Sequence, residues 1–241
     1  MAELGHDNGA KAGQQQLPLK VQLRDDATLD NFLALSDSQA LVDALHCQPG
    51  DEGEPIIYLY GPPGSGKSHL LQAACHLGGA STLYLPLSDL VQYSAAEVLQ
   101  GAQCVDRICI DDINAVLGIA TWERELFNLI NVARENGCRL VLSGLAAPRA
   151  LPVALEDLRS RLSWGIVYRL HEGDDKDKAM ILQFRADRRG IALPQAVANY
   201  IVSRAPRAMD ALLEVLDRLD ENSLVHKRSL SIPFVREIMG W

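Results

Sequence analysis

The chain has 241 residues and a formal net charge of −8 at pH 7. This length suits one large α/β domain and a small second one, and the 48% of hydrophobic residues suffice for their cores. The negative charge argues against a protein that mainly coats duplex DNA, although it is compatible with a local basic patch. No apolar run approaches the roughly 18 residues of a membrane span and the N-terminus has no signal-peptide segment, so we expect a cytoplasmic protein without a membrane partner.

We expect residues 1–26 to form a flexible N-terminal segment, because its first part is polar and contains glycine. Within it, Gln16, Leu17 and Leu19 surround Pro18, and a residue that precedes proline favours an extended backbone. An extended peptide with one glutamine and two spaced leucines can dock in an apolar pocket on a partner, with the amide fixing its register. The alternative is that these leucines begin the folded domain.

A helix is predicted from Ser36 to His46, capped by Ser36 or Asp37, and residues 48–55 predict a loop. A strand at 56–60 and a helical run at 69–77 then flank a stretch that reads G-x-x-x-x-G-K-S. Its glycines turn backbone amides inward, Lys67 supplies a cation for the β- and γ-phosphates, and Ser68 offers a hydroxyl to Mg²⁺. The alternative is a Gly/Pro turn that carries a lysine by chance. The residues predicted to bind the nucleotide here are Gly61, Pro62, Pro63, Gly64, Ser65, Gly66, Lys67, Ser68 and His69.

Residues 81–86 predict a second strand, which is followed by a helix over 88–99. A third strand is predicted at 106–112, where a buried apolar run ends in Asp111 and Asp112. Because the carboxyl ends of parallel strands gather at one edge of a sheet, both acids are expected beside the phosphate loop. There Asp111 would hold Mg²⁺ through water and Asp112 would orient an attacking water. The alternative is a pair of acids that caps a turn.

The pattern next predicts an amphipathic helix at 121–135, a strand at 138–144, a helix at 155–162 and a strand at 165–170. Near the end of the strand at 138–144, the polar Ser143 is expected to face the edge that holds the phosphate loop. After residue 170 the pattern predicts helices only: one over 174–190, one opened by Pro194, one opened by Pro206, and one over 232–239. We therefore predict an α/β fold, with a five-stranded parallel sheet in a domain at 27–172 and a small all-helical domain at 173–241.

Over nearly its whole length the chain resembles the AAA+ family of nucleotide-dependent switch and assembly ATPases, since GPPGSGKS matches the Walker A motif and ICIDD the Walker B motif. Within the family, TLDNF at 28–32, the Asp111–Asp112 pair and LRSRLSWG at 158–165 resemble DnaA-related proteins. The resemblance implies a P-loop NTPase core with a helical lid, and ADP or ATP with Mg²⁺ as ligands. It also implies that Arg161 is an arginine finger and that Arg207, at the start of the third lid helix, is a sensor that reaches the nucleotide.

Two features are similar to the DnaA-homologous regulators of replication initiation. QLPL near the start looks like a sliding-clamp binding motif formed by Gln16, Leu17 and Leu19, and the sequence ends directly after the lid, where the initiator continues into a DNA-binding domain. The resemblance implies regulatory inactivation of the DnaA replication initiator together with the DNA polymerase III sliding clamp (beta subunit). It also implies self-association, and contact with DNA only through the clamp.

Three positions depart from the family patterns, and they bear on the strength of each activity. Lys20 stands where the clamp motif usually ends in an apolar residue, and Ser143 stands where many AAA+ proteins place asparagine. Asp112 is one methylene shorter than the usual glutamate, so we expect weak intrinsic ATP hydrolysis. Three alternatives stay open: Arg161 could pair with acids of its own helix, the chain could act as a helicase loader or replisome assembly factor, or it could be a small-molecule kinase.

Overall fold

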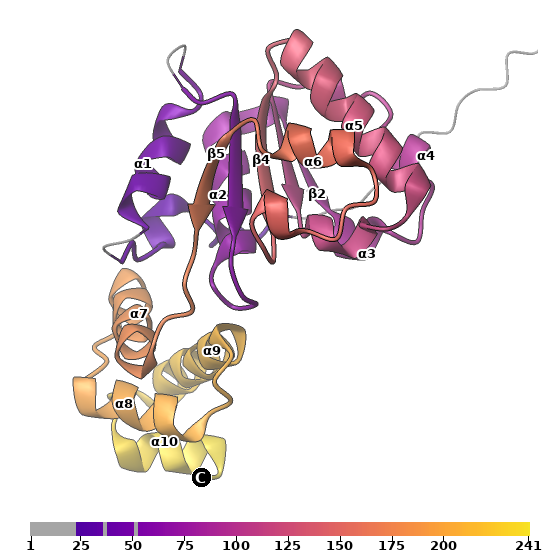
Figure 1. Ribbon diagram of the computed structural model, residues 1–241. Helices are drawn as coiled ribbons and strands as arrows, with labels where there is room; N and C mark the ends of the chain where they lie inside the picture. Colours follow the sequence, from indigo (N-terminus) through magenta and orange to yellow (C-terminus); the bar gives the residue numbers. More distant parts are fainter. Residues whose placement is uncertain (1–22, 36–37, 51–52) are drawn as a thin grey trace, which may run out of the picture.

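The computed structural model describes residues 23–35, 38–50 and 53–241. Its centre is a sheet of five parallel strands, ordered β2-β3-β4-β1-β5 (Figure 1). The strands are β1 (Ile56–Tyr60), β2 (Thr82–Pro86), β3 (Arg107–Asp111), β4 (Arg139–Gly144) and β5 (Ile166–Arg169). The predicted α/β fold with a five-stranded parallel sheet is therefore confirmed. Gln16, Leu17 and Leu19, the predicted clamp-binding residues, lie outside the described residues.

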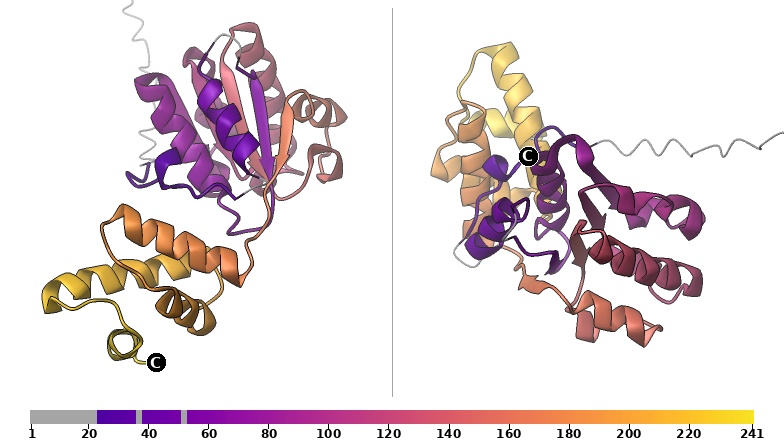
Figure 2. Two further views of the ribbon diagram at one scale, coloured as in Figure 1. Left: turned by 90° about the vertical axis from the view of Figure 1, so that its left-hand side faces the viewer. Right: turned by 90° about the horizontal axis from the view of Figure 1, so that it is seen from above.

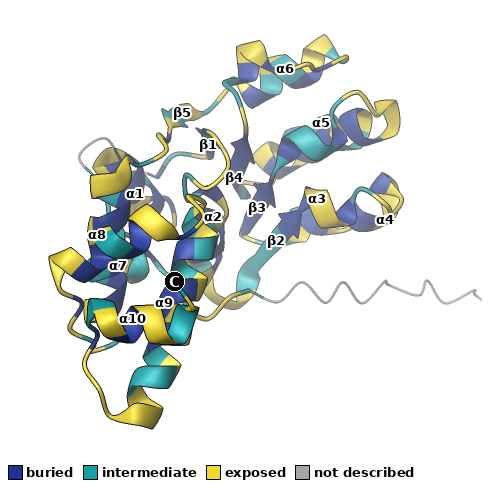
Figure 3. Cartoon of the chain, turned by 90° about the horizontal axis from the view of Figure 1, so that it is seen from below, coloured by how far each residue is buried: buried dark blue, intermediate teal, exposed yellow. Residues whose placement is uncertain are grey.

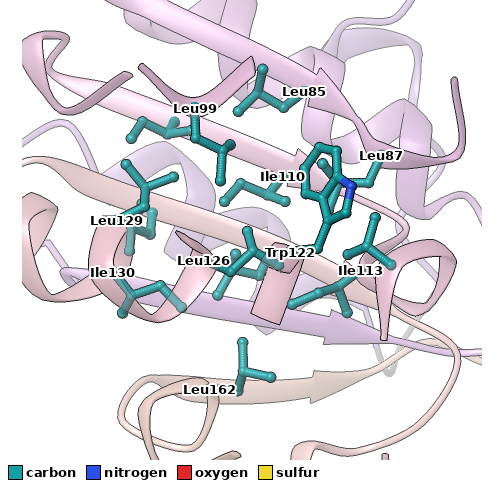
Figure 4. Close-up of a cluster of buried hydrophobic side chains, with 14 of the residues drawn as sticks. Leu85, Leu87, Leu99, Ile110, Ile113, Trp122, Leu126, Leu129, Ile130 and Leu162 are labelled. Carbon is teal, nitrogen blue, oxygen red and sulfur yellow. The ribbon is translucent and has the colours of Figure 1, made fainter. Parts of the chain in front are cut away.

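Both faces of the sheet are covered, as a parallel sheet requires. Because side chains alternate along a strand, Ile57 and Leu59 pack with α1 (Gln39–Cys47) and α2 (Lys67–Gly78), whereas Ile56 and Tyr58 belong to the core of the opposite face. That second core is built with α3 (Leu87–Leu90), α4 (Ala95–Leu99), α5 (Ala120–Glu135) and α6 (Glu156–Leu162). Figure 4 shows Trp122, Leu126 and Leu162 within this core.

The helix predicted over 88–99 is wrong, because the structure has two short helices there, α3 and α4, separated by residues 91–94. Ser94 takes an extended backbone conformation, with φ −66° and ψ 126°, and precedes the first residue of α4. Serine favours this position because its polar side chain competes with helical backbone hydrogen bonds. The carbonyl of Ser94 accepts the amide hydrogen of Val98 at 3.0 Å, which starts a new helix instead of continuing the old one.

After residue 174 the chain forms α7 (Asp175–Arg188), α8 (Gln195–Arg204), α9 (Met209–His226) and α10 (Ile232–Met239). These helices turn their buried sides toward one another and pack around their own apolar core (Figures 2 and 3). Asp174 starts α7 with a capping box, in which its carboxylate accepts the amide hydrogen of Asp177 and the side chain of Asp177 accepts that of Asp174. No described helix is long and apolar enough to cross a membrane.

Two other helices begin later than predicted. The first begins at Gln39 instead of Ser36, and the two expected caps, Ser36 and Asp37, lie outside the described residues. The third lid helix begins at Met209 instead of Pro206, because Ala208 has an extended backbone, with φ −64° and ψ 133°. Arg207 consequently lies in the turn that precedes this helix.

Candidate nucleotide-binding site

A cavity of about 690 Å³ lies between the carboxyl edge of the sheet and the lid helices. Segments that are far apart in the sequence meet there: the loop after β1, the end of β3, the stretch before α1, the connection from β5 to α7, and parts of α7 and α9. The predicted site residues that line it are Pro63, Gly64, Ser65, Gly66, Lys67, Ser68, His69, Asp111 and Asp112. The structure thus brings the predicted phosphate loop and the acid pair into one cavity.

The loop between β1 and α2 requires glycine at several positions. Gly64 and Gly66 have φ angles of +76° and +89°, in the left-handed region that glycine adopts without a steric penalty. A Cβ atom on Gly66 would also lie 2.9 Å from the ring of Phe32, and one on Gly61 would lie 2.3 Å from the carbonyl oxygen of Leu170. The hydroxyl of Ser65 is buried in this loop without a hydrogen-bond partner among the described residues. The loop therefore has the backbone shape and the close approaches that a phosphate cradle needs.

Lys67 is the first residue of α2, and only 9% of it is exposed. Its Nζ donates hydrogen bonds to the carbonyl oxygens of Gly61 and Pro62, each at 2.8 Å. Burial lowers the pKa of the ammonium group, whereas the nearby Asp111 and Asp112 act in the opposite direction. Because both hydrogen-bond acceptors are neutral, these contacts leave the positive charge able to attract an anion in the cavity.

Asp111 ends β3, and both oxygens of its carboxylate are hydrogen-bonded. The hydroxyl of Tyr84 donates to Oδ2 at 2.7 Å, and the hydroxyl of Ser143 donates to Oδ1. Ser143 Oγ also accepts the amide hydrogen of Asp112 at 2.8 Å. The sequence analysis placed Ser143 at this edge but missed Tyr84. Tyr84 could have been found from the sheet register, because Pro86 pairs with Asp111 and Tyr84 lies two residues before Pro86 on the same strand. These two hydroxyls fix the orientation of the carboxylate.

Asp112 lies just beyond β3 with a φ angle of 54°, an unusual conformation for a residue other than glycine. Burial raises the pKa of its carboxyl group, the negative charge of Asp111 raises it further, and Lys67 opposes both effects. A carboxylate with a raised pKa is a suitable acceptor for a proton from water.

The stretch before α1 holds the lid against the core. Arg185 of α7 is buried and donates to the carbonyl oxygen of Asn31 at 3.1 Å, and it also pairs with the carboxylate of Asp26. Burial alone would raise the pKa of Asp26, but hydrogen bonds from Arg24 and Arg185 lower this pKa to about 2. On the core side, a ring nitrogen of His69 lies 2.8 Å from the carbonyl oxygen of Thr28, and burial lowers the pKa of His69. Sequence reasoning missed Arg185 and Asp26.

Arg207 does not contact the cavity in the described part of the chain. Its guanidinium is 78% exposed and lies 3.7 Å from the carboxylate of Asp175, measured from Nη2 to Oδ2. Arg207 precedes α9 instead of lying within it, and its side chain lies beside Asp175, the first residue of α7. That Arg207 reaches a nucleotide stays a prediction.

Arg161 is separated from the cavity and lies in a second, shallower hollow of about 500 Å³ on the outside of α5 and α6, among the described residues. Its Nε donates to Oδ1 of Asn131 at 2.7 Å, and its Cζ lies 3.9 Å from the ring centroid of Trp164. The predicted alternative was an ion pair of Arg161 with Glu156 or Asp157 on the same helix; Glu156 instead pairs with Arg159 at 3.1 Å.

Comparisons with known proteins agree with this architecture. A sequence model of the bacterial DnaA ATPase domain matches residues 23–169, and a model of the lid domain of Hda matches residues 175–239. An uncharacterised protein of Haemophilus influenzae is 39% identical over 230 residues, which are 94% of this chain and 99% of that protein.

Solved structures share the fold. Domain III of the replication initiation protein DnaA of Thermotoga maritima has a TM-score of 0.74 at 21% identity, covering 91% of this chain and 98% of that one. DnaA of Aquifex aeolicus bound to AMPPCP has a TM-score of 0.67 at 23% identity, covering 81% and 66%. A RuvB protein of Thermotoga maritima has a TM-score of 0.64 at 20% identity, covering 89% and 71%. At these identities the likeness establishes the fold alone.

Proposed function

The chain belongs to the DnaA-related family of AAA+ ATPases and carries an Hda-type lid, and from this premise we propose that it is a regulator which inactivates the DnaA replication initiator. In this proposal it holds ADP or ATP in its own cavity, docks on ATP-bound DnaA, and promotes hydrolysis of the nucleotide that DnaA holds. The result is an ADP-loaded initiator and repression of a second round of initiation.

The cavity residues fit an adenine nucleotide with Mg²⁺. The glycines of the loop expose backbone amides, Lys67 would bind the phosphates, and the hydroxyl of Ser68 with the carboxylate of Asp111 would hold the metal ion. The buried hydroxyl of Ser65, without a partner among the described residues, is a further donor that faces this loop. When bound, the metal ion neutralises charge on the phosphates. His69 and the residues before α1 would close the cavity on the side of the base.

The observation that carries the proposal is the position of Arg161. Its guanidinium lies outside the chain's own cavity, on a surface where Asn131 and Trp164 hold it. An arginine supplied to a neighbouring subunit stabilises charge that develops only in the transition state of phosphoryl transfer, and such a finger raises hydrolysis by roughly 10³- to 10⁵-fold. An oriented arginine that does not serve its own nucleotide suits this task.

We expect the chain to hydrolyse ATP in its own cavity only slowly. Asp112 is the residue proposed to orient a water molecule, and its side chain is one methylene shorter than the usual glutamate of the family. Because a displacement of about 1 Å from the near-attack geometry can lower the rate about a hundredfold, a shorter acid lowers the rate. The nucleotide in the cavity then has mainly a conformational effect on the chain.

Binding to the sliding clamp rests on the sequence motif Gln16, Leu17 and Leu19, which precedes the described residues. The clamp would bring the chain to DNA, in keeping with the net charge of −8, which does not favour direct binding to a phosphate backbone. Replacing the three residues by alanine should abolish clamp binding while leaving nucleotide binding unchanged. Unaltered clamp binding would contradict this part of the proposal and would favour the alternative function, that of a helicase loader or replisome assembly factor.

The central test is Arg161→Ala. Turnover of DnaA-bound ATP is measured with clamp and DNA present, against the wild type and against Arg124→Ala, which removes an exposed arginine of α5 that does not line the hollow around Arg161. We expect Arg161→Ala to lower the stimulated rate by at least about a hundredfold and Arg124→Ala to leave it unchanged. Undiminished turnover with Arg161→Ala would sink the proposal.

A further inference from the structure

The hollow that contains Arg161 also contains a second arginine on the same aromatic ring. The Cζ atom of Arg134, in the last turn of α5, lies 4.3 Å from the ring centroid of Trp164, and that of Arg161 lies 3.9 Å from it. The two guanidinium carbons are therefore no farther apart than the sum of these distances. Figures 1 and 3 show how this arises, because α5 and α6 lie side by side on one face of the sheet.

Two cations beside one ring make this hollow locally positive, which favours an anionic ligand. The hollow is lined by Asn131, Arg134, Glu135, Arg161 and Trp164, and its one carboxylate leaves a net positive charge among these residues. The chain as a whole is negative, with a formal charge of −8, so this is a local exception. An exposed tryptophan that supports two guanidinium groups also keeps their planes oriented, since stacking on an indole restricts their rotation.

We propose that Arg134 and Arg161 together form a two-arginine site for the terminal phosphates of a nucleotide bound to the neighbouring DnaA subunit, with Trp164 as their common support. This inference rests on the proposed function and adds a residue to it. Arg134 contacts the phosphates, and Trp164 is a positioning residue that acts through both arginines.

The hydrogen-bonding pattern supports a phosphate as the ligand. Asn131 accepts from Nε of Arg161, so this contact leaves the two terminal nitrogens of that guanidinium free to donate outward. Arg134 is exposed at the carboxyl end of α5, where the helix dipole favours a cation. Two planar guanidinium groups that line one hollow match a polyphosphate, which offers several acceptor oxygens in different directions and two or more negative charges. A single carboxylate of a peptide would satisfy only one of the forks.

The experiment measures turnover of DnaA-bound ATP as a function of the concentration of this chain, with clamp and DNA present. The variants are Arg134→Ala, Arg134→Lys, Arg161→Ala and, as the matched control on α5, Arg124→Ala. We expect Arg134→Ala to lower the maximal stimulated rate about tenfold or more, because a phosphate-directed donor acts in the transition state. Arg134→Lys should restore part of that rate, since it keeps the charge and loses the planar fork. Nucleotide binding to the chain's own cavity should remain that of the wild type for all four.

The outcomes separate this inference from the function on which it rests. If Arg161→Ala lowers the maximal rate and Arg134→Ala behaves like Arg124→Ala, the two-arginine site is wrong and the proposed function stands. If Arg134→Ala changes only the half-saturating concentration, Arg134 is a docking residue and the phosphate assignment is overturned. If neither variant lowers the rate, both proposals fall. Thermal unfolding of each variant identifies one that has not folded, and Arg134→Lys then serves as the variant that decides.

Discussion

Glu123 connects the surface that carries Arg161 to the body of the domain. It is 1% exposed, and its carboxylate accepts backbone amide hydrogens from Gly118 and Leu155 at 2.7 Å and from Ala154 at 3.0 Å. Leu155 is the residue that precedes α6, so this side chain holds the backbone at the start of the helix. Its removal should therefore affect both stability and the orientation of Arg161.

We predict that Glu123→Ala lowers the free energy of unfolding by about 3–5 kcal/mol. Each hydrogen bond to a charged group contributes about 1.5–3 kcal/mol, and the sum is reduced because water can reach some of the freed amides. Glu123→Gln should cost about 1–2 kcal/mol, since its carbonyl oxygen still accepts while its amide nitrogen meets other donors. Urea unfolding monitored by circular dichroism gives both values. A loss below about 1 kcal/mol for Glu123→Ala would refute the reasoning.

The same contacts predict a pH dependence. Burial alone would raise the pKa of Glu123, but the three backbone donors lower this pKa below its ordinary value of 4.5. The stabilisation is therefore fully present above the unfolded-state pKa and is lost as the pH falls through the lower, folded-state pKa. Comparing the stability of the wild type with that of Glu123→Gln between about pH 3 and 6 isolates this contribution, because the variant cannot titrate at this position. Parallel curves would contradict it.

Three further predictions concern the cavity and the lid. Tyr84→Phe removes one of the two hydroxyls on Asp111, so nucleotide binding titrated at several Mg²⁺ concentrations should need more Mg²⁺ than in the wild type; an unchanged requirement would argue against metal binding by that carboxylate. Gly66→Ala should weaken nucleotide binding and cost about 1–2 kcal/mol, measured by thermal shift with and without ADP, because φ is +89° and the new Cβ would lie 2.9 Å from the ring of Phe32. Asp26→Asn should lower stability by about 1 kcal/mol near neutral pH, after allowance for solvent screening of its half-exposed carboxylate. Because the pKa of Asp26 is lowered to about 2, this contribution should be lost as the pH falls from about 4 toward 2, and equal acid sensitivity of wild type and variant would exclude it.

The sequence alone determined the parts of this protein that depend on neighbouring residues. The loop glycines, Lys67 and Ser68 lie within one short stretch, so their spacing predicts a phosphate cradle without knowledge of the fold. Asp111 and Asp112 could be placed beside it because parallel strands end at the same edge of a sheet. The helix over 88–99 could not be predicted correctly, because the apolar pattern continues across Ser94 while the backbone does not.

Only the tertiary structure decided the contacts that orient these groups. Tyr84 and Asp111 lie on different strands, and Asp26 and Arg185 are 159 residues apart. Arg134 and Arg161 both lie over the ring of Trp164 only because α5 and α6 pack side by side. Periodicity and motif spacing describe a chain over one or two turns or strands, within which the backbone geometry is nearly constant. Hydrogen bonds and stacked charges between distant segments depend on how whole elements pack, and local sequence patterns carry little information about that packing.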